Sequence, residues 1–172
     1  MIITVGGYPG SGTTTLSKKI EDVCGLTHVY AGKIFREMAA ERGVSLEGLG
    51  ELAENDDTID LEVDQKQKML AIGNTVVEGR ITAFLIEADL KIWLSAPLEV
   101  RAQRICEREK ILYEESVKRI EKREKSEKKR YQTYYTIDLD DLSLYDLVIN
   151  TALWDAEGVF QIVKTAIEVR EW

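Results

Sequence analysis

The sequence contains little cysteine, proline or histidine: two, two and one residues, respectively, among 172. Cys24 and Cys106 lie far apart in stretches with helical periodicity, and neither has a Cys or His companion at metal-ligand spacing. We therefore expect two reduced, partly buried thiols. This composition argues against a disulfide-stabilised scaffold and against a cysteine-based metal site.

Long apolar runs are also absent, since none approaches the roughly 20 residues that span a bilayer. Residues 1–5 lack a basic region and lead directly into glycines, so they do not resemble a signal peptide. We expect a cytoplasmic protein without a membrane partner. Hydrophobic residues make up 44% and charged residues 31% of the chain, which is typical of a globular protein. The length fits one domain over residues 1–172.

The chain has no net positive charge and carries a formal charge of −8 at pH 7. This balance argues against an extended surface for duplex nucleic acid, so we expect no nucleic-acid partner. Residues 101–130 nevertheless hold 12 Lys/Arg and 7 Asp/Glu, a balance of +5, which leaves −13 on the other residues. A local basic segment on an acidic body suits small phosphorylated ligands. We expect a monomer that binds such small molecules.

Short apolar runs alternate with helical patterns along the chain. Strands are predicted at residues 1–6, 27–30, 74–78, 90–94 and 147–150. Helices are predicted at 13–24, at about 31–42, at 114–130 and at 157–169. Two more are predicted within 45–72, separated by a break around 54–57, and another begins with Pro97 in its first turn. The stretch 114–130 is so rich in charge that it is predicted to be a solvated helix. This order predicts an α/β fold with a parallel sheet.

A glycine-rich segment follows the first predicted strand directly. It matches the phosphate-loop pattern G-x-x-x-x-G-K-[ST], with Thr13 in place of lysine. Backbone N–H groups of such a loop and the helix that follows favour a triphosphate, and Thr14 is placed to put its hydroxyl on Mg²⁺. The candidate nucleotide-binding residues are Gly7, Tyr8, Pro9, Gly10, Ser11, Gly12, Thr13, Thr14 and Thr15. Without the lysine, another cation must supply its charge, or turnover is poor.

Two arginines follow neighbouring predicted strands. Ligands collect at the carboxyl ends of parallel strands, so Arg36 and Arg80 are expected to face the loop and clamp a phosphate dianion. The alternative is that each arginine forms an ordinary surface ion pair. Glu78 is placed to hold a metal-bound water, or is instead a structural partner of Arg80 or Arg36.

The basic segment supplies further candidate catalytic residues. Phosphoryl transfer depends on positioning and on neutralising charge, so a closing lid that brings arginines is useful. We select Arg123 and Arg130 as catalytic together with Arg80, and Arg119 stays open. For most other cations of this segment a solvated surface is the simpler interpretation.

The sequence also contains several longer motifs: GxPGxGTTT at 7–15, AGxIFREMA at 31–39, VEGR at 77–80, ADLKIWLxAPLEVRAxRI at 88–105, SEKKRY at 126–131 and IDxDDLSxYDLVINT at 137–151. Taken together, they resemble the archaeal-type cytidylate kinases, a branch of the nucleoside monophosphate kinases. They cover nearly the whole chain. Threonine in place of the loop lysine is a trait of that family.

The resemblance implies a P-loop kinase fold with a five-stranded parallel core, a helical acceptor-binding lobe over 37–72 and a lid over 110–140. It implies ATP at the loop, residues 7–15. From the residues themselves we expect Mg²⁺ with that ATP, with Thr14 and Glu78 as metal-site residues. The resemblance also implies CMP or dCMP as acceptor, with its phosphate at Arg36 and Arg80, and lid arginines over the transferring group. Gly79, next to Arg80, is a further candidate substrate-binding residue.

The acidic stretch 54–64 offers carboxylates that can accept from the cytosine amino group, with Asp60 and Asp64 as candidates. An acidic solvated helix explains the same residues. Spacing by itself does not select the base, so kinases of AMP, UMP or shikimate stay open. A nucleotide-binding switch without turnover is the alternative outside enzymes.

The expected chemistry is in-line attack by a CMP oxygen on the γ-phosphorus of ATP. No strong general base is needed, because a phosphate monoester with a second pKa near 6 is mostly dianionic at neutral pH. The single histidine, His28, lies near the start of a predicted strand and is expected to be structural, away from the site.

Overall fold

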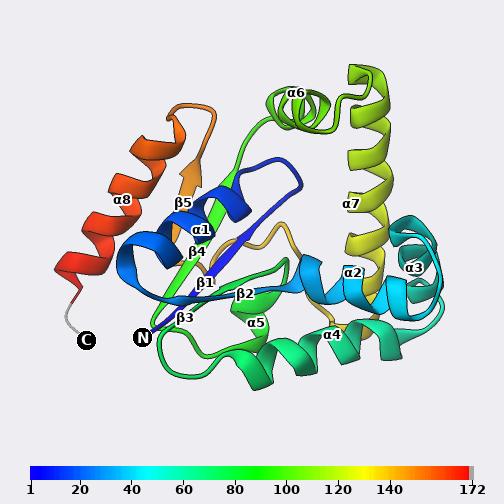
Figure 1. Cartoon of the computed structure of the whole chain (residues 1–172), viewed down its shortest axis with the longest axis horizontal. Helices are drawn as coiled ribbons and strands as arrows, with labels where there is room; N and C mark the ends of the chain where they lie inside the picture. Colours follow the sequence, from blue (N-terminus) through cyan, green and yellow to red (C-terminus); the bar gives the residue numbers. More distant parts are fainter. Residues whose placement is uncertain (171–172) are drawn as a thin grey trace.

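The computed structural model describes residues 1–170 and contains a five-stranded sheet surrounded by helices (Figure 1). The strands are β1 (Ile2–Gly7), β2 (Thr27–Tyr30), β3 (Thr75–Glu78), β4 (Leu90–Ser95) and β5 (Leu147–Asn150). The helices are α1 (Thr13–Cys24), α2 (Ala31–Glu41), α3 (Leu46–Ala53), α4 (Asp57–Leu70), α5 (Thr82–Leu85), α6 (Leu98–Glu109), α7 (Tyr113–Tyr135) and α8 (Ala156–Val169). All five predicted strands are confirmed.

The sheet is parallel throughout, in the order β2-β3-β1-β4-β5. β1 lies at its centre, with Val5 in register with Glu78 on one side and Ile92 on the other. The carboxyl ends of all five strands therefore meet at one edge, and the loop after β1 lies in the middle of that edge. The predicted α/β class is confirmed.

Alternating side chains of the strands build two different faces. Ile3, Val5, Val76 and Ile92 are fully buried and pack toward α1 and α8. On the opposite face Trp93 packs with Tyr145 and with Ala83 of α5, a helix of four residues that the sequence pattern did not predict. The second face is thus covered by a short helix and by the segment 137–145, which follows α7.

Side-chain caps explain where several helices begin. The Asp56 carboxylate accepts from the Thr58 N–H at 3.0 Å and starts α4, which accounts for the predicted break around 54–57. Ser45 and Asp155 cap α3 and α8 in the same way. Pro97 is the residue before α6 and not, as predicted, in its first turn.

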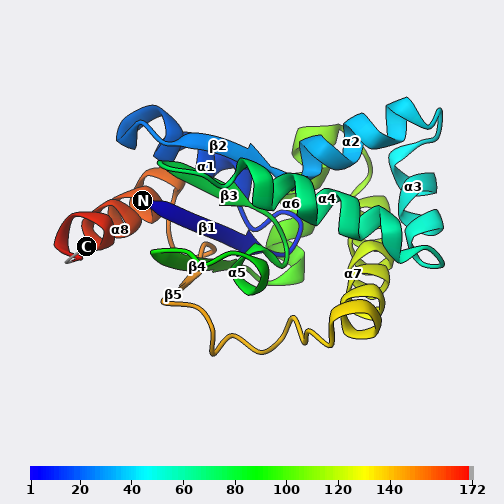
Figure 2. The same cartoon turned by 90° about the horizontal axis from the view of Figure 1, so that it is seen from below.

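Helices α2, α3 and α4 extend away from the sheet, and the long helix α7 passes beside them (Figures 1 and 2). They share an apolar cluster of their own, which includes Met38, Leu49, Ala53 and Ile59. The prediction that α7 is solvated is only partly right. Ser116, Ile120, Glu127 and Arg130 form a buried stripe along one of its faces, because this face packs on α6 and on the α2–α4 group.

Two further features concern residues 1–170. No helix in this range is both long and apolar enough to cross a membrane. Cys24 and Cys106 are free and partly buried, as predicted.

Candidate functional site

The loop between β1 and α1 has the backbone geometry of an anion-binding turn. Gly10 and Gly12 have φ angles of 83° and 100°, a region that favours glycine. A Cβ atom on Gly10 would lie 2.7 Å from the Arg101 carbonyl oxygen, so no larger residue fits. The Ser11 N–H donates to the Tyr8 carbonyl at 3.0 Å, while those of Gly10 and Gly12 have no acceptor within residues 1–170. These N–H groups, at the N-terminus of α1, are suited to phosphate oxygens.

Glu78 lies at the end of β3, directly beside this loop. Its Oε1 atom accepts from the hydroxyls of Thr13 at 2.8 Å and Thr14 at 2.6 Å. Its Oε2 atom lies 2.9 Å from His28 Nε2, within hydrogen-bond distance. Glu78 is 4% exposed. The predicted alternative, a pair with Arg80 or Arg36, is wrong, because the loop hydroxyls and His28 occupy both oxygens.

The prediction that His28 lies away from the site is also wrong. In the parallel register His28 is beside Val76, two residues before Glu78 on the same face of the sheet. Side chains lean along the strand direction. The buried imidazole, stacked on Tyr30 with ring centroids 5.7 Å apart, thereby reaches the carboxylate.

A hard oxygen donor set of this kind fits Mg²⁺. Glu78 and Thr14 supply a buried carboxylate and a hydroxyl, but residues 1–170 contain no group of three or more His, Cys, Asp or Glu that could hold a metal ion. Mg²⁺ is commonly bound through one or two carboxylates plus waters and substrate phosphates. Thr14 and Glu78 therefore fit a metal that would arrive with a nucleotide.

The two arginines of the predicted phosphate clamp differ in their surroundings. The Arg80 side chain is 11% exposed, and its Nε donates to Glu127 at 2.7 Å. Arg36 is exposed on α2, and its guanidinium lies over the Tyr30 ring at 5.0 Å. Gly79 lies between β3 and Arg80, where a Cβ atom would lie 3.1 Å from Gln67 Nε2. The two arginines thus have separate partners, a carboxylate for Arg80 and an aromatic ring for Arg36.

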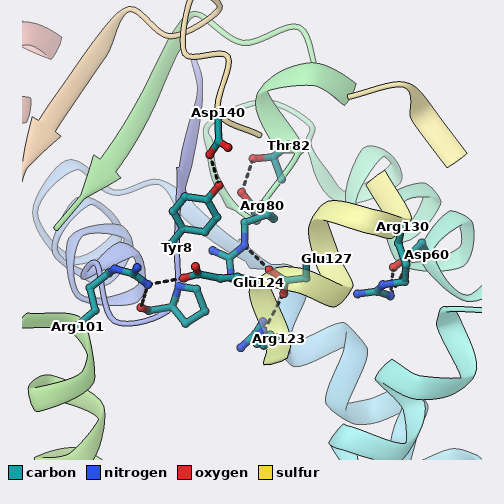
Figure 3. Close-up of polar contacts among 12 residues, drawn as sticks. Tyr8, Asp60, Arg80, Thr82, Arg101, Arg123, Glu124, Glu127, Arg130 and Asp140 are labelled. Atoms are coloured by element: carbon teal, nitrogen blue, oxygen red, sulfur yellow. Dashed lines mark hydrogen bonds and ion pairs between the residues drawn. The ribbon is translucent and has the colours of Figure 1, made fainter. Parts of the chain in front are cut away.

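The lid candidates are held by acidic partners. Arg123 Nε donates to Glu127 at 2.8 Å, so one carboxylate joins Arg123 and Arg80 (Figure 3). Arg130 is buried, and its Nη1 donates to both oxygens of Asp60 at 2.8 and 2.9 Å. The Arg130 pair thus joins a predicted catalytic residue to a predicted substrate-binding residue.

Asp60 and Asp64 are both buried, so the alternative of a solvated acidic helix is wrong for these two residues. Burial raises the pKa of each carboxyl to about 6. For Asp60 this effect outweighs the charge of Arg130, and for Asp64 it outweighs a hydrogen bond donated by the Tyr135 hydroxyl. Both groups therefore titrate close to neutral pH.

Three cationic side chains lie around the ring of Tyr8, which is inside the loop. The guanidiniums of Arg80 and Arg101 and the ammonium of Lys128 lie 5.3–5.8 Å from its ring centroid. Its hydroxyl donates to Asp140 at 2.7 Å (Figure 3). Burial and this carboxylate raise the pKa of the phenol. Each of these cations also pairs with a carboxylate: Arg80 with Glu127, Arg101 with Glu124 and Lys128 with Asp140.

Two arginines of α6 hold the loop through its carbonyl groups. Arg101 Nη1 donates to the Pro9 carbonyl at 3.2 Å and pairs with Glu124, and Arg104 Nη1 donates to the Gly10 carbonyl at 3.2 Å. Neither was selected as a site residue from the sequence. Their i,i+3 spacing after a predicted strand and their place in the motif at 88–105 are the sequence signals that could have indicated them.

A cavity of about 200 Å³ opens beside the loop on the β4–β5 side. Its lining comes from the loop, β4, α6 and the segment between β5 and α8: Ser11, Gly12, Thr15, Leu16, Leu94, Arg104, Thr151, Trp154, Asp155, Ala156 and Val159. Thr151 and Trp154 were not predicted as site residues. The position of Thr151 directly after the last strand is the signal that would have indicated it.

Comparisons with known proteins identify relatives of this chain. The family model of the cytidylate kinase-like family matches residues 2–153. The cytidylate kinase of Pyrococcus horikoshii is 55% identical over 98% of this chain and 88% of its own length. The corresponding enzymes of Methanocaldococcus jannaschii and Methanopyrus kandleri are 53% and 51% identical over 98% of this chain, and over 98% and 93% of their own lengths.

Solved structures support the fold. An uncharacterised protein from Eubacterium ventriosum superposes with a TM-score of 0.74 at 18% identity, covering 99% of both chains. Shikimate kinase from Acinetobacter baumannii superposes with a TM-score of 0.64 at 16% identity, covering 96% of this chain and 92% of its own. With the family match over most of its length and relatives above 50% identity over nearly all of it, this chain belongs to the cytidylate kinase-like family.

Proposed function

We propose that this chain transfers the γ-phosphoryl group of ATP to CMP or dCMP, giving ADP and the corresponding diphosphate. The observation that carries the proposal is the phosphate loop at the centre of the sheet edge, in a chain more than 50% identical to curated cytidylate kinases over nearly all its length. The proposal assigns one side of this loop to each substrate.

The donor side lies toward β4 and β5. The cavity there is lined in part by Ser11 and Gly12 of the loop, and Arg104 and Trp154 offer flat surfaces for an adenine ring. The loop N–H groups and the N-terminus of α1 would bind the triphosphate. When bound, Mg²⁺ neutralises charge that develops on the phosphate oxygens, and Thr14 and Glu78 are the residues that would hold it.

The acceptor side lies toward β3 and β2. Arg80 follows β3 and Arg36 follows β2, so their guanidiniums would hold the acceptor's phosphate opposite the donor. With the acceptor oxygen already ionised, the protein needs only to orient it and to exclude water. A histidine acting as general base is unnecessary, and His28 instead positions Glu78.

The cytosine ring would lie between α4 and α7. Asp60 and Asp64 offer carboxylate oxygens that can accept from its amino group. Arg130 is bound to Asp60 in this structure. A role of Arg130 over the transferring phosphoryl group, as predicted, would require this pair to open, whereas Arg123 on the exposed side of α7 can act without such a change.

A coupled assay of ADP release tests the proposal. Mg·ATP is offered with CMP, dCMP, UMP, AMP, GMP or shikimate, and a reaction without acceptor is the control. Release that strongly favours CMP and dCMP is expected. Release with another acceptor would show that the chain phosphorylates that acceptor in place of CMP. ATP binding without acceptor-dependent release would contradict the kinase function.

A further inference from the structure

One carboxylate connects the core of the molecule to α7. Glu127 is 5% exposed, although it lies on a helix rich in solvated charge. Its Oε2 accepts from Arg80 Nε at 2.7 Å, and its Oε1 accepts from Arg123 Nε at 2.8 Å (Figure 3). Both oxygens are therefore used, each by a different arginine.

The choice of nitrogen matters for what each arginine can still bind. A guanidinium presents five N–H donors, and Nε carries only one of them. Neither Arg80 nor Arg123 donates a hydrogen bond from Nη1 or Nη2 to any residue in 1–170, so the terminal edge of each remains available. That edge is suited to pair with two phosphate oxygens at once.

Charge leads to the same interpretation. Burial would by itself raise the pKa of Glu127, but the charges and hydrogen bonds of Arg80 and Arg123 outweigh it and lower that pKa to about 2. The carboxylate is thus ionised at neutral pH, and the three groups together carry one net positive charge. Arg80 also lies 5.8 Å from the ring of Tyr8, inside the phosphate loop.

We propose that Glu127 is a positioning residue that sets Arg80 and Arg123 as one two-armed receptor for the phosphate of the acceptor. Arg80 follows the end of β3, while Arg123 lies on α7 with its side chain 56% exposed. The shared carboxylate fixes the separation and orientation of the two guanidiniums before substrate arrives. This inference rests on the proposed function, since it assumes that Arg80 binds the acceptor's phosphate.

The competing explanation is a structural ion pair that only attaches α7 to the core. The two explanations differ in ligand dependence. A structural link affects stability and all ligands alike, whereas a phosphate receptor distinguishes CMP from cytidine, which has the same base and sugar but no phosphate.

The test is Glu127→Gln, with Glu121→Gln as the matched control on the same helix, where the side chain is exposed and without a partner in residues 1–170. Gln retains one acceptor oxygen but turns an N–H₂ group toward one of the Nε–H donors, so one arginine loses its partner. Affinities for CMP, cytidine and ATP are measured by calorimetry, together with KM for CMP and kcat.

CMP affinity and kcat/KM for CMP are expected to fall by roughly 10- to 100-fold, because a displacement of about 1 Å in a binding group can cost this much. Cytidine and ATP affinities stay within about twofold, because neither ligand uses the two guanidiniums as a paired phosphate site. Glu121→Gln matches the parent protein throughout. Equal losses for CMP and cytidine, or a folded Glu127→Gln protein with unchanged CMP affinity, would overturn the inference.

A second variant and the activity of the parent protein separate the other outcomes. If Glu127→Gln does not fold, Glu127→Asp replaces it, because it keeps both oxygens and the charge but withdraws them by one methylene; CMP affinity equal to the parent's would then overturn the proposal. If the parent protein itself does not phosphorylate CMP, the proposed function fails, whereas a normal parent with a normal variant refutes only the role of Glu127.

Discussion

At the position where a phosphate loop ordinarily carries lysine, the Thr13 hydroxyl is bound to Glu78. Thr14 uses the same carboxylate oxygen, so the two threonines hold the start of α1 against the end of β3. His28 occupies the other oxygen. The residue that replaces lysine thus contributes to orienting the predicted metal site and adds no positive charge.

Glu78→Gln is expected to lower kcat by about 100-fold or more and to raise the Mg²⁺ concentration needed for half-maximal rate. A neutral amide is a poor ligand for a hard cation or its waters, and charge neutralisation is central to phosphoryl transfer. The measurement is a Mg²⁺ titration of the ADP-release rate. The matched control is Glu87→Gln, an exposed residue without a partner in the described chain. An unchanged Mg²⁺ dependence in a folded variant would remove Glu78 from the metal site.

At the scale of elements, α7 is attached to the α3–α4 group by contacts of two kinds. Exposed ion pairs join Lys122 to Glu47 and Glu51, and such pairs contribute little in water. A buried ion pair joins Arg130 to Asp60, and a partly buried hydrogen bond joins Tyr135 to Asp64. The carboxyl groups of these two contacts have the raised pKa values.

Asp64→Asn is expected to reduce the stability that the folded protein loses as the pH rises from 4 to 6. The folded-state pKa of Asp64, about 6, lies above its ordinary value of 3.8. In this window the folded protein therefore binds more protons than the unfolded chain, and its contribution to stability falls as the pH rises, then levels off above pH 6. Asn keeps an oxygen for the Tyr135 hydroxyl but does not titrate.

Urea unfolding at pH 4.5 and 7.5 measures this effect. Between these two pH values the free energy of unfolding of the parent protein is expected to fall by about 1–3 kcal/mol more than that of Asp64→Asn. The folded and unfolded pKa values differ by about two, and each pH unit corresponds to about 1.36 kcal/mol. Glu127, with its lowered pKa, contributes in the opposite direction, but equally in both proteins. Identical pH dependence in the two proteins would show that Asp64 is ionised in the fold at much lower pH.

At the scale of the whole molecule, the proposed donor and acceptor sites lie on opposite sides of one loop. The cavity lies toward β4 and β5, and the predicted arginine clamp lies toward β3 and β2. A molecule that spans both sides must cross the phosphate loop. This geometry predicts that one ligand with two nucleosides and a phosphate chain binds better than either nucleotide.

An analogue that joins adenosine and cytidine through five phosphates is expected to raise the midpoint of thermal unfolding more than ATP and CMP added together at the same concentration. A ligand present at about 1,000 times its Kd stabilises by about 4 kcal/mol. The control analogue has the same nucleosides joined by two phosphates, too few to reach both sides. Equal shifts from both analogues, measured by scanning calorimetry, would contradict the two-sided arrangement.

Much of the fold followed from local pattern. The apolar run of β1, the glycines after it and the helix from Thr13 are contiguous, so short-range chemistry was sufficient to predict the strand, the loop and the helix. The parallel order then placed Arg80 at the carboxyl edge of the sheet. Helix α5 has only four residues, too few for a helical repeat of apolar residues to be recognised. The buried stripe of α7 was not predicted, because charged residues dominate the sequence of that helix.

Contacts between distant residues were decided only by packing. Arg80 and Glu127 are 47 residues apart, His28 and Glu78 are 50 apart, and Asp60 and Arg130 are 70 apart. Residue types and spacing determined the phosphate loop, the candidate phosphate-binding arginines and the family that the chain resembles. They did not determine which carboxylate holds which arginine, because that depends on how two helices and a strand end meet in space and on how deeply each charge is buried.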